Sequence, residues 1–312
     1  MKYELTVFGV KDMTENVAAF IHENLRPVDL VITIGAAVTA KNHVAGFTSL
    51  GGLTEKYGIP VFEADSYPLT DEKTKRLFAD NEFSLGLSLG WQRLVPKAVL
   101  DAFPYGVFGF HGNSGYLPFG RGRSPLNWSL LLGDTRFNLN LFRYDEKADS
   151  PNVFATQMFS LTPHDNIRTA QYKHMICAKQ LLVELLSVYA LAVENDMELP
   201  IRTESKDFDS WYTKRTAADG KIDFRQRTRE IYNLIRAVAA PFPGAWTMVG
   251  EDKLVVWEAH PFDEIMDFSA YAPGEVVDIF DGNLVVRTVD GSLLIEEYEC
   301  EREIEVGDVL GS

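Results

Sequence analysis

The sequence has little cysteine: only Cys177 and Cys300. Two cysteines cannot make a disulfide framework, and neither has neighbours at the spacing of zinc ligands, so we expect no metal. Cys177 lies in a helical pattern, where a small buried hydrophobic side chain fits.

Nucleotide-binding glycine motifs are also missing. The turns at residues 35–37 and 51–52 contain glycine, but neither reads GxGxxG or GxxxxGK[ST]. The sequence therefore gives no support for a nicotinamide or P-loop site, and ordinary turns at strand ends are favoured.

Positive charge is scarce. Lysine and arginine number 30 against 45 aspartates and glutamates, a formal net charge of −15. Proteins that bind DNA or tRNA normally present a basic face, since phosphate contacts supply much of the affinity. We expect no nucleic-acid partner, although a local basic patch is compatible with an acidic whole.

The distribution of apolar residues predicts neither a targeting signal nor a membrane span. The first ten residues, MKYELTVFGV, lack the long apolar region of a signal peptide and predict a strand. The longest apolar run, residues 181–193, contains Glu184 and is too short to span a bilayer. We expect a cytoplasmic protein with no membrane partner.

What is present predicts an α/β protein of two domains. Apolar, β-favouring stretches alternate with helical patterns, at Tyr3–Val10, Asp29–Gly35, Gly58–Phe62 and Phe83–Leu89. This spacing is typical of βαβ units and a mostly parallel, Rossmann-like sheet. The first helix is expected from about Thr14, as its cap. A long helix over residues 165–193 closes a first domain, predicted at residues 1–200.

A smaller second domain is predicted at residues 211–312, after a polar linker at residues 197–209. Its first elements are a short strand at residues 222–224 and a helix over residues 228–239. Short strands at residues 247–258, 275–280, 283–289 and 292–299 follow, separated by DG and GN turn signals. Such strands predict a small open β-barrel-like domain.

The stretch from Tyr105 to Gly133 carries the most chemistry. A short strand, residues 106–110, delivers His111 at its carboxyl end, where open α/β sheets bind ligands. Four glycines and a proline follow. We interpret them as an irregular loop held close to a ligand, with Arg121 and Arg123 on it and a helix starting near Ser124-Pro125.

Two carboxylates are candidate partners for His111. Asp145 and Asp149 both follow a strand predicted at residues 137–144, beside the one that ends at His111. Either aspartate alone is typical of a solvated loop. A carboxylate next to an imidazole orients the ring and favours its charged form, as general acid–base catalysis requires.

Three segments together resemble a known family: HGNSGYLPFGRGRSPLNW, KADSPNVFA and RAVAAPFPGAWTMVGEDKLVVW. They are similar to the formyltransferases that use N10-formyltetrahydrofolate. The likeness is greatest to the nucleotide-sugar N-formyltransferases, such as UDP-4-amino-4-deoxy-arabinose formyltransferases, and weaker to methionyl-tRNA formyltransferase. It covers most of the chain and is most specific at GRGRSPLNW and PFPGAW.

The resemblance implies a catalytic set of an Asn-x-His pair and a distant aspartate. His111 matches the histidine and Asp149 the aspartate, but Gly109 stands where the family has asparagine. Asn113, in an apparent insertion after the histidine, is our candidate for the missing amide.

For the formyl donor, the resemblance implies pterin contacts with the main chain at Leu89, Gly90 and Trp91. Leu117 and Pro118 would form a wall of the same pocket. Core packing is the alternative for Trp91.

Candidate ligands for the diphosphate of a nucleotide sugar are Lys214, Arg215 and Arg236, because charged donors suit phosphate oxygens. Ordinary surface roles are equally typical of these three. Arg121 and Arg123 are favoured because they lie in the site loop.

The sequence thus favours formyl transfer from N10-formyltetrahydrofolate to the amine of a nucleotide-linked deoxyamino sugar, in lipopolysaccharide or other glycan biosynthesis. One alternative is methionyl-tRNA formylation, which the acidic composition disfavours. Another is a catalytically impaired folate-binding protein, suggested by Gly109. The oligomeric state stays open, a homodimer included.

Overall fold

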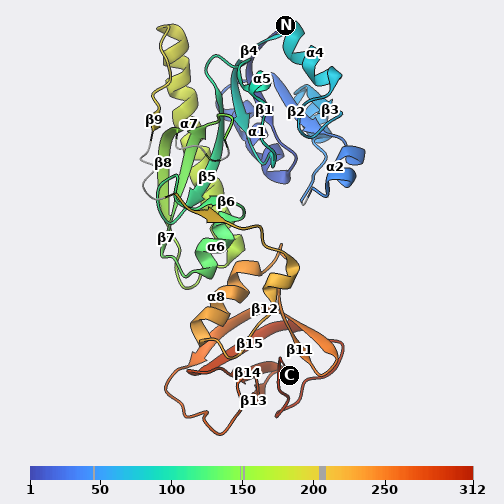
Figure 1. Ribbon diagram of the computed structural model, residues 1–312, viewed down its shortest axis with the longest axis vertical. Helices are drawn as coiled ribbons and strands as arrows, with labels where there is room; N and C mark the ends of the chain where they lie inside the picture. The colour runs from blue at the N-terminus through green and yellow to red at the C-terminus, as the bar shows by residue number, and fades with distance from the viewer. Residues whose placement is uncertain (45, 148, 150–151, 204–208, 312) are drawn as a thin grey trace.

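The computed structural model describes residues 1–44, 46–147, 149, 152–203 and 209–311, and its strands form two large sheets (Figure 1). The strands of the first sheet, in spatial order, are β3 (Val61–Ala64), β2 (Leu30–Ile34), β1 (Lys2–Phe8), β4 (Glu82–Ser88), β5 (Val107–Asn113), β7 (Arg136–Arg143), β8 (Asn152–Ser160) and β9 (Arg202–Thr203). Strands β1 to β5 are parallel, and β7 to β9 are antiparallel.

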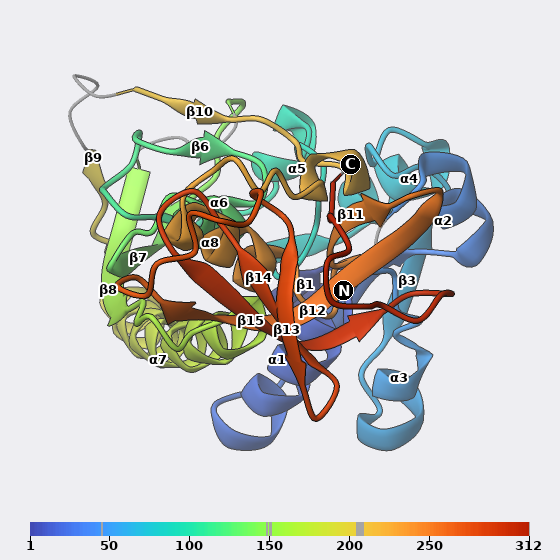
Figure 2. The same cartoon turned by 90° about the horizontal axis from the view of Figure 1, so that it is seen from below.

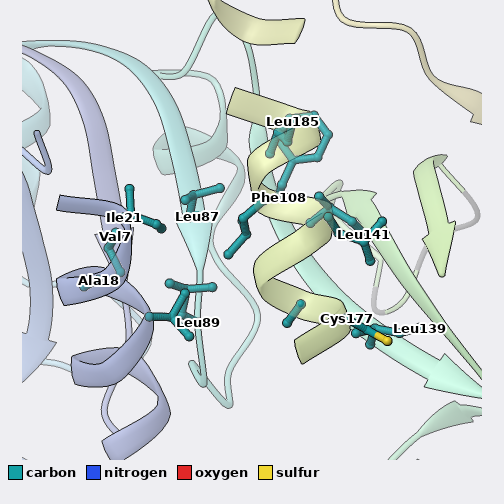
Figure 3. Close-up of a cluster of buried hydrophobic side chains, with 14 of the residues drawn as sticks. Val7, Ala18, Ile21, Leu87, Leu89, Phe108, Leu139, Leu141, Cys177 and Leu185 are labelled. Atoms are coloured by element: carbon teal, nitrogen blue, oxygen red, sulfur yellow. The ribbon is translucent and has the colours of Figure 1, made fainter. Parts of the chain in front are cut away.

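Helices cover both faces of this sheet. On one face lie α1 (Asp12–Asn24), α3 (Gly51–Tyr57) and α7 (Ile167–Glu194), which share one apolar core with the sheet. Figure 3 shows part of this core, with Ile21 of α1, Leu87 of β4 and Cys177 of α7. On the other face, α2 (Ala36–Asn42), α4 (Glu72–Asp80) and α5 (Lys97–Leu100) pack around a second core.

Helix α7 contains the apolar run of residues 181–193, which by itself is too short to span a membrane. With 28 residues, the whole helix is long and apolar enough to cross one by length and composition. One face of the helix belongs to the protein core: Ala178, Leu182 and Leu185 are fully buried against the sheet.

The second sheet is antiparallel and comes from the C-terminal third of the chain. Its strands, in spatial order, are β11 (Ala245–Val249), β12 (Asp252–Asp263), β15 (Ser292–Glu299), β14 (Asn283–Arg287) and β13 (Val276–Phe280). Helix α8 (Thr228–Val238) packs on it with a core of its own, and a 3-10 turn (Ala217–Gly220) precedes α8. The predicted fold class is confirmed: a mostly parallel α/β sheet and a separate antiparallel sheet.

Some predicted elements were wrong in detail. The strand expected at residues 247–258 is two strands, because Gly250, with φ +60°, turns the chain between β11 and β12. Residues 222–224 form no strand. Helix α1 begins at Asp12, so Thr14 is its third residue and not its cap.

Strand β5 is longer than predicted and continues through Asn113. The glycine that follows His111 suggests a loop, yet pairing with β7 keeps the strand regular, with His111 opposite Asn140 and Gly112 opposite Leu139. A Cβ at Gly112 would lie 2.6 Å from Cζ of Phe137, so glycine here admits that ring and does not end the strand.

The two sheets meet through α6 (Pro125–Leu131) and α8. Asn127 Nδ2 donates to the Ala237 carbonyl at 2.8 Å across this junction. Helix α6 begins with Pro125 at its first position, as predicted, after Ser124. The junction therefore fixes the loop before α6, which carries the candidate site.

Candidate active site

His111 lies on the face of β5 that points away from α7. Side chains alternate along a strand, so Phe110 faces His174 of α7, whereas His111 and Gly109 face the opposite side. His111 is only 7% exposed. It is thus a strand residue at the edge where the parallel strands end.

Both ring nitrogens of His111 face oxygen atoms. Nδ1 lies 3.4 Å from Oδ1 of Asp149, and Nε2 lies 2.8 Å from the carbonyl oxygen of Gly120. A neutral imidazole has one N–H and can donate to only one of them. The carboxylate on one side and the carbonyl on the other fix the orientation of the ring.

Of the two candidate carboxylates, Asp149 is the one that the structure places beside His111. Its other oxygen, Oδ2, accepts from the main-chain N–H of Gly122 at 2.9 Å. Asp145 instead accepts from the Lys147 N–H and the Asn152 amide in the turn before β8. Asp149 therefore joins the histidine to the glycine loop.

That loop is held by the segment that links the two sheets. Its short strand β6 (Arg121–Gly122) pairs in parallel with β10 (Trp211–Tyr212), and the two lie side by side in Figure 2. Gly122 has φ +104°, and a Cβ there would lie 3.2 Å from the nitrogen of Tyr212, so a side chain would separate the strands.

Arg121 belongs to the pairing of β6 with β10, which we call the clasp. Its guanidinium pairs with the Asp209 carboxylate and lies 4.5 Å from the centre of the Trp211 ring. Because its charge is already compensated, we assign Arg121 to fastening the loop, in place of the predicted role as a phosphate ligand.

Asn113 does not occupy the place expected of it. Its side chain is fully buried, its Nδ2 donates to the Phe119 carbonyl, and its Oδ1 accepts from the Gly115 N–H at 2.7 Å. Both ends of the amide shape the loop after β5. The prediction that Asn113 reaches the formyl oxygen is inconsistent with this geometry.

Tyr144, which was not predicted as a site residue, fills the space beside Gly109. A Cβ at residue 109 would lie 2.5 Å from Cε1 and 2.6 Å from Cζ of Tyr144. The Tyr144 hydroxyl donates to Oγ of Ser88 at 3.1 Å. The signal lay in FNLNLFRY, whose alternation sends Tyr144 to the same face as Phe142, but only the pairing of β5 with β7 places it at Gly109.

Of the residues predicted for the pterin, Gly90 offers an accessible main chain: it is half-buried, and no hydrogen bond described for the chain uses it. The carbonyl of Leu89 already accepts from Oγ1 of Thr14 at 2.5 Å. The Trp91 side chain lies in the core against Tyr67, with ring centres 4.8 Å apart. Its core position agrees with the alternative considered for Trp91.

Leu117 and Pro118 have different surroundings. Leu117 is 1% exposed and shares a small cluster with Phe142, Val153 and Tyr144, beside Gly109. Pro118, joined to it by a cis peptide, accepts through its carbonyl from the Ser210 N–H at 3.4 Å. Leu117 thus forms a wall on the face that carries His111.

Arg123 is the predicted cation that stays exposed in the site loop. Burial lowers the pKa of Lys11; the charge of Asp12 opposes this shift and that of Arg123 adds to it. The Lys11 side chain also lies against Gly90. Lys11 and Arg123 thus place positive charge near Gly90, which favours an anionic ligand.

The remaining predicted cations lie beyond the clasp. Lys214 is exposed. Arg215 lies 5.2 Å from the Trp128 ring centre and donates to the Asp219 carbonyl, and burial lowers its pKa. Arg236 was wrong as a phosphate candidate: it is 6% exposed at the junction of the sheets and donates to main-chain carbonyls.

Comparisons with known proteins agree with this organisation. Residues 214–310 match the family described as formyl transferase, C-terminal domain. The crystal structure of WlaRD, a sugar 3N-formyl transferase with dTDP and 5-N-formyl-THF, aligns with a TM-score of 0.64 and 15% identity over 97% of this chain and 99% of that one. The structure of an N-formyltransferase from Helicobacter canadensis, in complex with folinic acid and dTDP-3-aminofucose, aligns with a TM-score of 0.64 and 16% sequence identity. The alignment covers 94% of this chain and 99% of that one.

HypX from Aquifex aeolicus, in complex with tetrahydrofolic acid, gives a TM-score of 0.62 and 16% identity over 96% of this chain. The chain spans 44% of the length of that protein. At these identities the structural matches show the fold. The resemblance to formyltransferases is confirmed, in sequence for the C-terminal part and in fold for almost the whole chain.

Proposed function

We propose that this protein transfers the formyl group of N10-formyltetrahydrofolate to the amine of a nucleotide-linked deoxyamino sugar. The observation that carries the proposal is the His111–Asp149 pair, held under a glycine loop at the carboxyl end of β5. The shared fold of WlaRD and the Helicobacter canadensis enzyme, whose crystals contained formyl folates with dTDP or a dTDP-sugar, supports both substrate classes.

The reaction forms a bond between the amine nitrogen and the formyl carbon and breaks the bond from that carbon to N10 of the folate. The amine loses a proton, and N10 gains one. In between, the formyl oxygen carries negative charge, which hydrogen-bond donors at the site stabilise. His111 is the group placed to move the proton, and Asp149 keeps the ring oriented through Nδ1.

The Nε2 end of His111 is the end that serves the substrate. In this structure it faces the Gly120 carbonyl, which a reacting group would replace. The proposal therefore requires the loop that carries Gly120 to move away from Nε2 when the substrate binds, although β6 of this loop is paired with β10. Asp149 holds the other nitrogen throughout.

The donor and the sugar nucleotide would occupy neighbouring places. The free main chain of Gly90 and the wall formed by Leu117 suit the pterin ring. Exposed Arg123, with Lys11 beside it, suits the phosphates of the nucleotide.

The test mixes the enzyme and formyl donor with a panel of UDP-, dTDP- and GDP-amino sugars, and with initiator methionyl-tRNA as a separate acceptor. We expect release of tetrahydrofolate and a formylated sugar with at least one nucleotide sugar and none with tRNA. If tetrahydrofolate is released only with tRNA, or is not released with any acceptor in the panel, the proposal is overturned.

A further inference from the structure

The proposed function leaves one role unfilled. The developing charge on the formyl oxygen needs a donor, and the residue two before His111 on the same face is Gly109, which has no side chain. Asn113 is engaged in its own loop. The structure nevertheless fills the space at Gly109 with the ring of Tyr144.

Pairing between strands brings the tyrosine there. Gly109 lies opposite Phe142, and Tyr144 follows two residues later on the same face. The Tyr144 main-chain N–H donates to the Val107 carbonyl at 2.8 Å, which prolongs the ladder by one residue. The phenol therefore reaches back across β5 toward the end of β4.

Packing fixes the Tyr144 ring. It lies 5.1 Å from the ring centre of Phe142 and packs with Leu117 and Val153. Its hydroxyl meets Ser88, the last residue of β4, which is the register partner of Gly109. Two hydroxyl groups can exchange donor and acceptor roles, so Ser88 can donate to Tyr144 while Tyr144 donates elsewhere.

The phenol also keeps its proton. Burial raises the pKa of Tyr144 to about 12, the hydrogen bond with Ser88 opposes the rise, and the charge of Asp149 adds to it. At neutral pH the hydroxyl is therefore a hydrogen-bond donor.

We propose that Tyr144 donates the hydrogen bond that stabilises the formyl oxygen, in the place left vacant at Gly109, with Ser88 as its positioning residue. Same-face positions two apart on a strand are separated by about 7 Å. A formyl group between residues 109 and 111 thus has the phenol on one side and the imidazole on the other. This inference rests on the proposed function.

The position of Tyr144 restricts residue 109. Residue 109 cannot carry a side chain while Tyr144 stays in place, because the new Cβ would collide with the ring. An asparagine at 109 would therefore need a smaller residue at 144.

The experiment compares formyl transfer by wild type, Tyr144→Phe and the exposed control Tyr172→Phe, with thermal melting as the check of folding. We expect Tyr144→Phe to keep the fold and lose about 10²–10³-fold in kcat, the range for removing one donor to a developing oxyanion. KM for the formyl donor should change by less than about threefold, because the contact forms mainly in the transition state. Ser88→Ala should lose less, and Tyr172→Phe nothing.

An exchange of residues gives the second arm. The single variant Gly109→Asn should have a lower kcat than wild type, because the new amide would collide with Tyr144. The double variant Gly109→Asn/Tyr144→Ala should have a higher kcat than Tyr144→Ala alone. If Tyr144→Phe does not fold, this pair decides: equal activity of Tyr144→Ala with and without the asparagine overturns the inference.

The outcomes separate the two proposals. An active wild type with an equally active Tyr144→Phe overturns the role of Tyr144 and leaves the proposed function intact. A wild type that formylates no amine overturns the proposed function, and the inference with it.

Discussion

Arg236 offers the sharpest test of how the two sheets are joined. Replacing it with methionine keeps the length of the side chain and removes the guanidinium. That group donates to three main-chain carbonyls, those of Thr162, Asp165 and Leu130, at 3.0, 3.0 and 3.3 Å. It also donates to Oδ1 of Asn233 at 2.9 Å.

The expected cost follows from these contacts. Each lost hydrogen bond costs about 1 kcal/mol, so the three to main-chain carbonyls give about 3 kcal/mol, although the Thr162 and Leu130 carbonyls keep main-chain donors. Burial lowers the pKa of Arg236, which means that desolvation opposes its charged form, so removing the charge recovers part of this cost. Against a typical stability of about 5–15 kcal/mol, this loss is large.

The measurement is urea unfolding followed by tryptophan fluorescence, with Arg229→Met as the control. Arg229 lies on the same helix but is exposed, so its replacement should change the free energy of unfolding by less than about 0.5 kcal/mol. If Arg236→Met loses less than about 1 kcal/mol and instead raises KM for the nucleotide sugar, the structural role is wrong and the original phosphate role returns.

Three further predictions concern the site and the core. Asp149→Asn should reduce kcat severely, and its combination with His111→Ala should be little worse than the poorer single variant in steady-state kinetics; additive losses would show that the two act separately. Arg123→Met should raise KM for the nucleotide sugar about tenfold with little change in kcat, whereas Arg121→Met should mainly lower the melting temperature. Equal KM values for the two variants would contradict this division of roles. Burial lowers the pKa of His174 to about 4, so between about pH 6.5 and 4 the unfolded chain binds a proton that the folded chain does not. The free energy of unfolding should therefore fall by up to about 3 kcal/mol as pH drops through that window, and His174→Gln should not show this fall. If chemical unfolding gives wild type and His174→Gln the same dependence of stability on pH, the assignment to His174 is refuted.

The parallel half of the fold follows from local patterns. Strands β1, β2 and β4 and helix α7 lie within a few residues of their predicted ranges, because buried apolar runs and helical spacing are local signals. The β-hairpin at Gly250 and the continuation of β5 were missed. Both depend on pairing with a partner strand, which composition does not report.

The same distinction applies to the site. His111 and Asp149 carry chemical signals of their own, and the structure places their side chains together. Tyr144 is an ordinary aromatic residue in an alternating strand until its register with Gly109 is known. Arg236 has the residue type of a phosphate ligand, yet its position on the inner face of α8 gives it a structural role.

The central claim is that His111 moves the proton in formyl transfer. The most direct measurement is kcat of His111→Ala with the sugar nucleotide that the wild type accepts, after thermal melting has shown the variant to be folded. We expect a loss of about 10²–10⁴-fold, the usual range for a positioned acid or base. A folded His111→Ala protein with nearly full activity would contradict the assignment of the site.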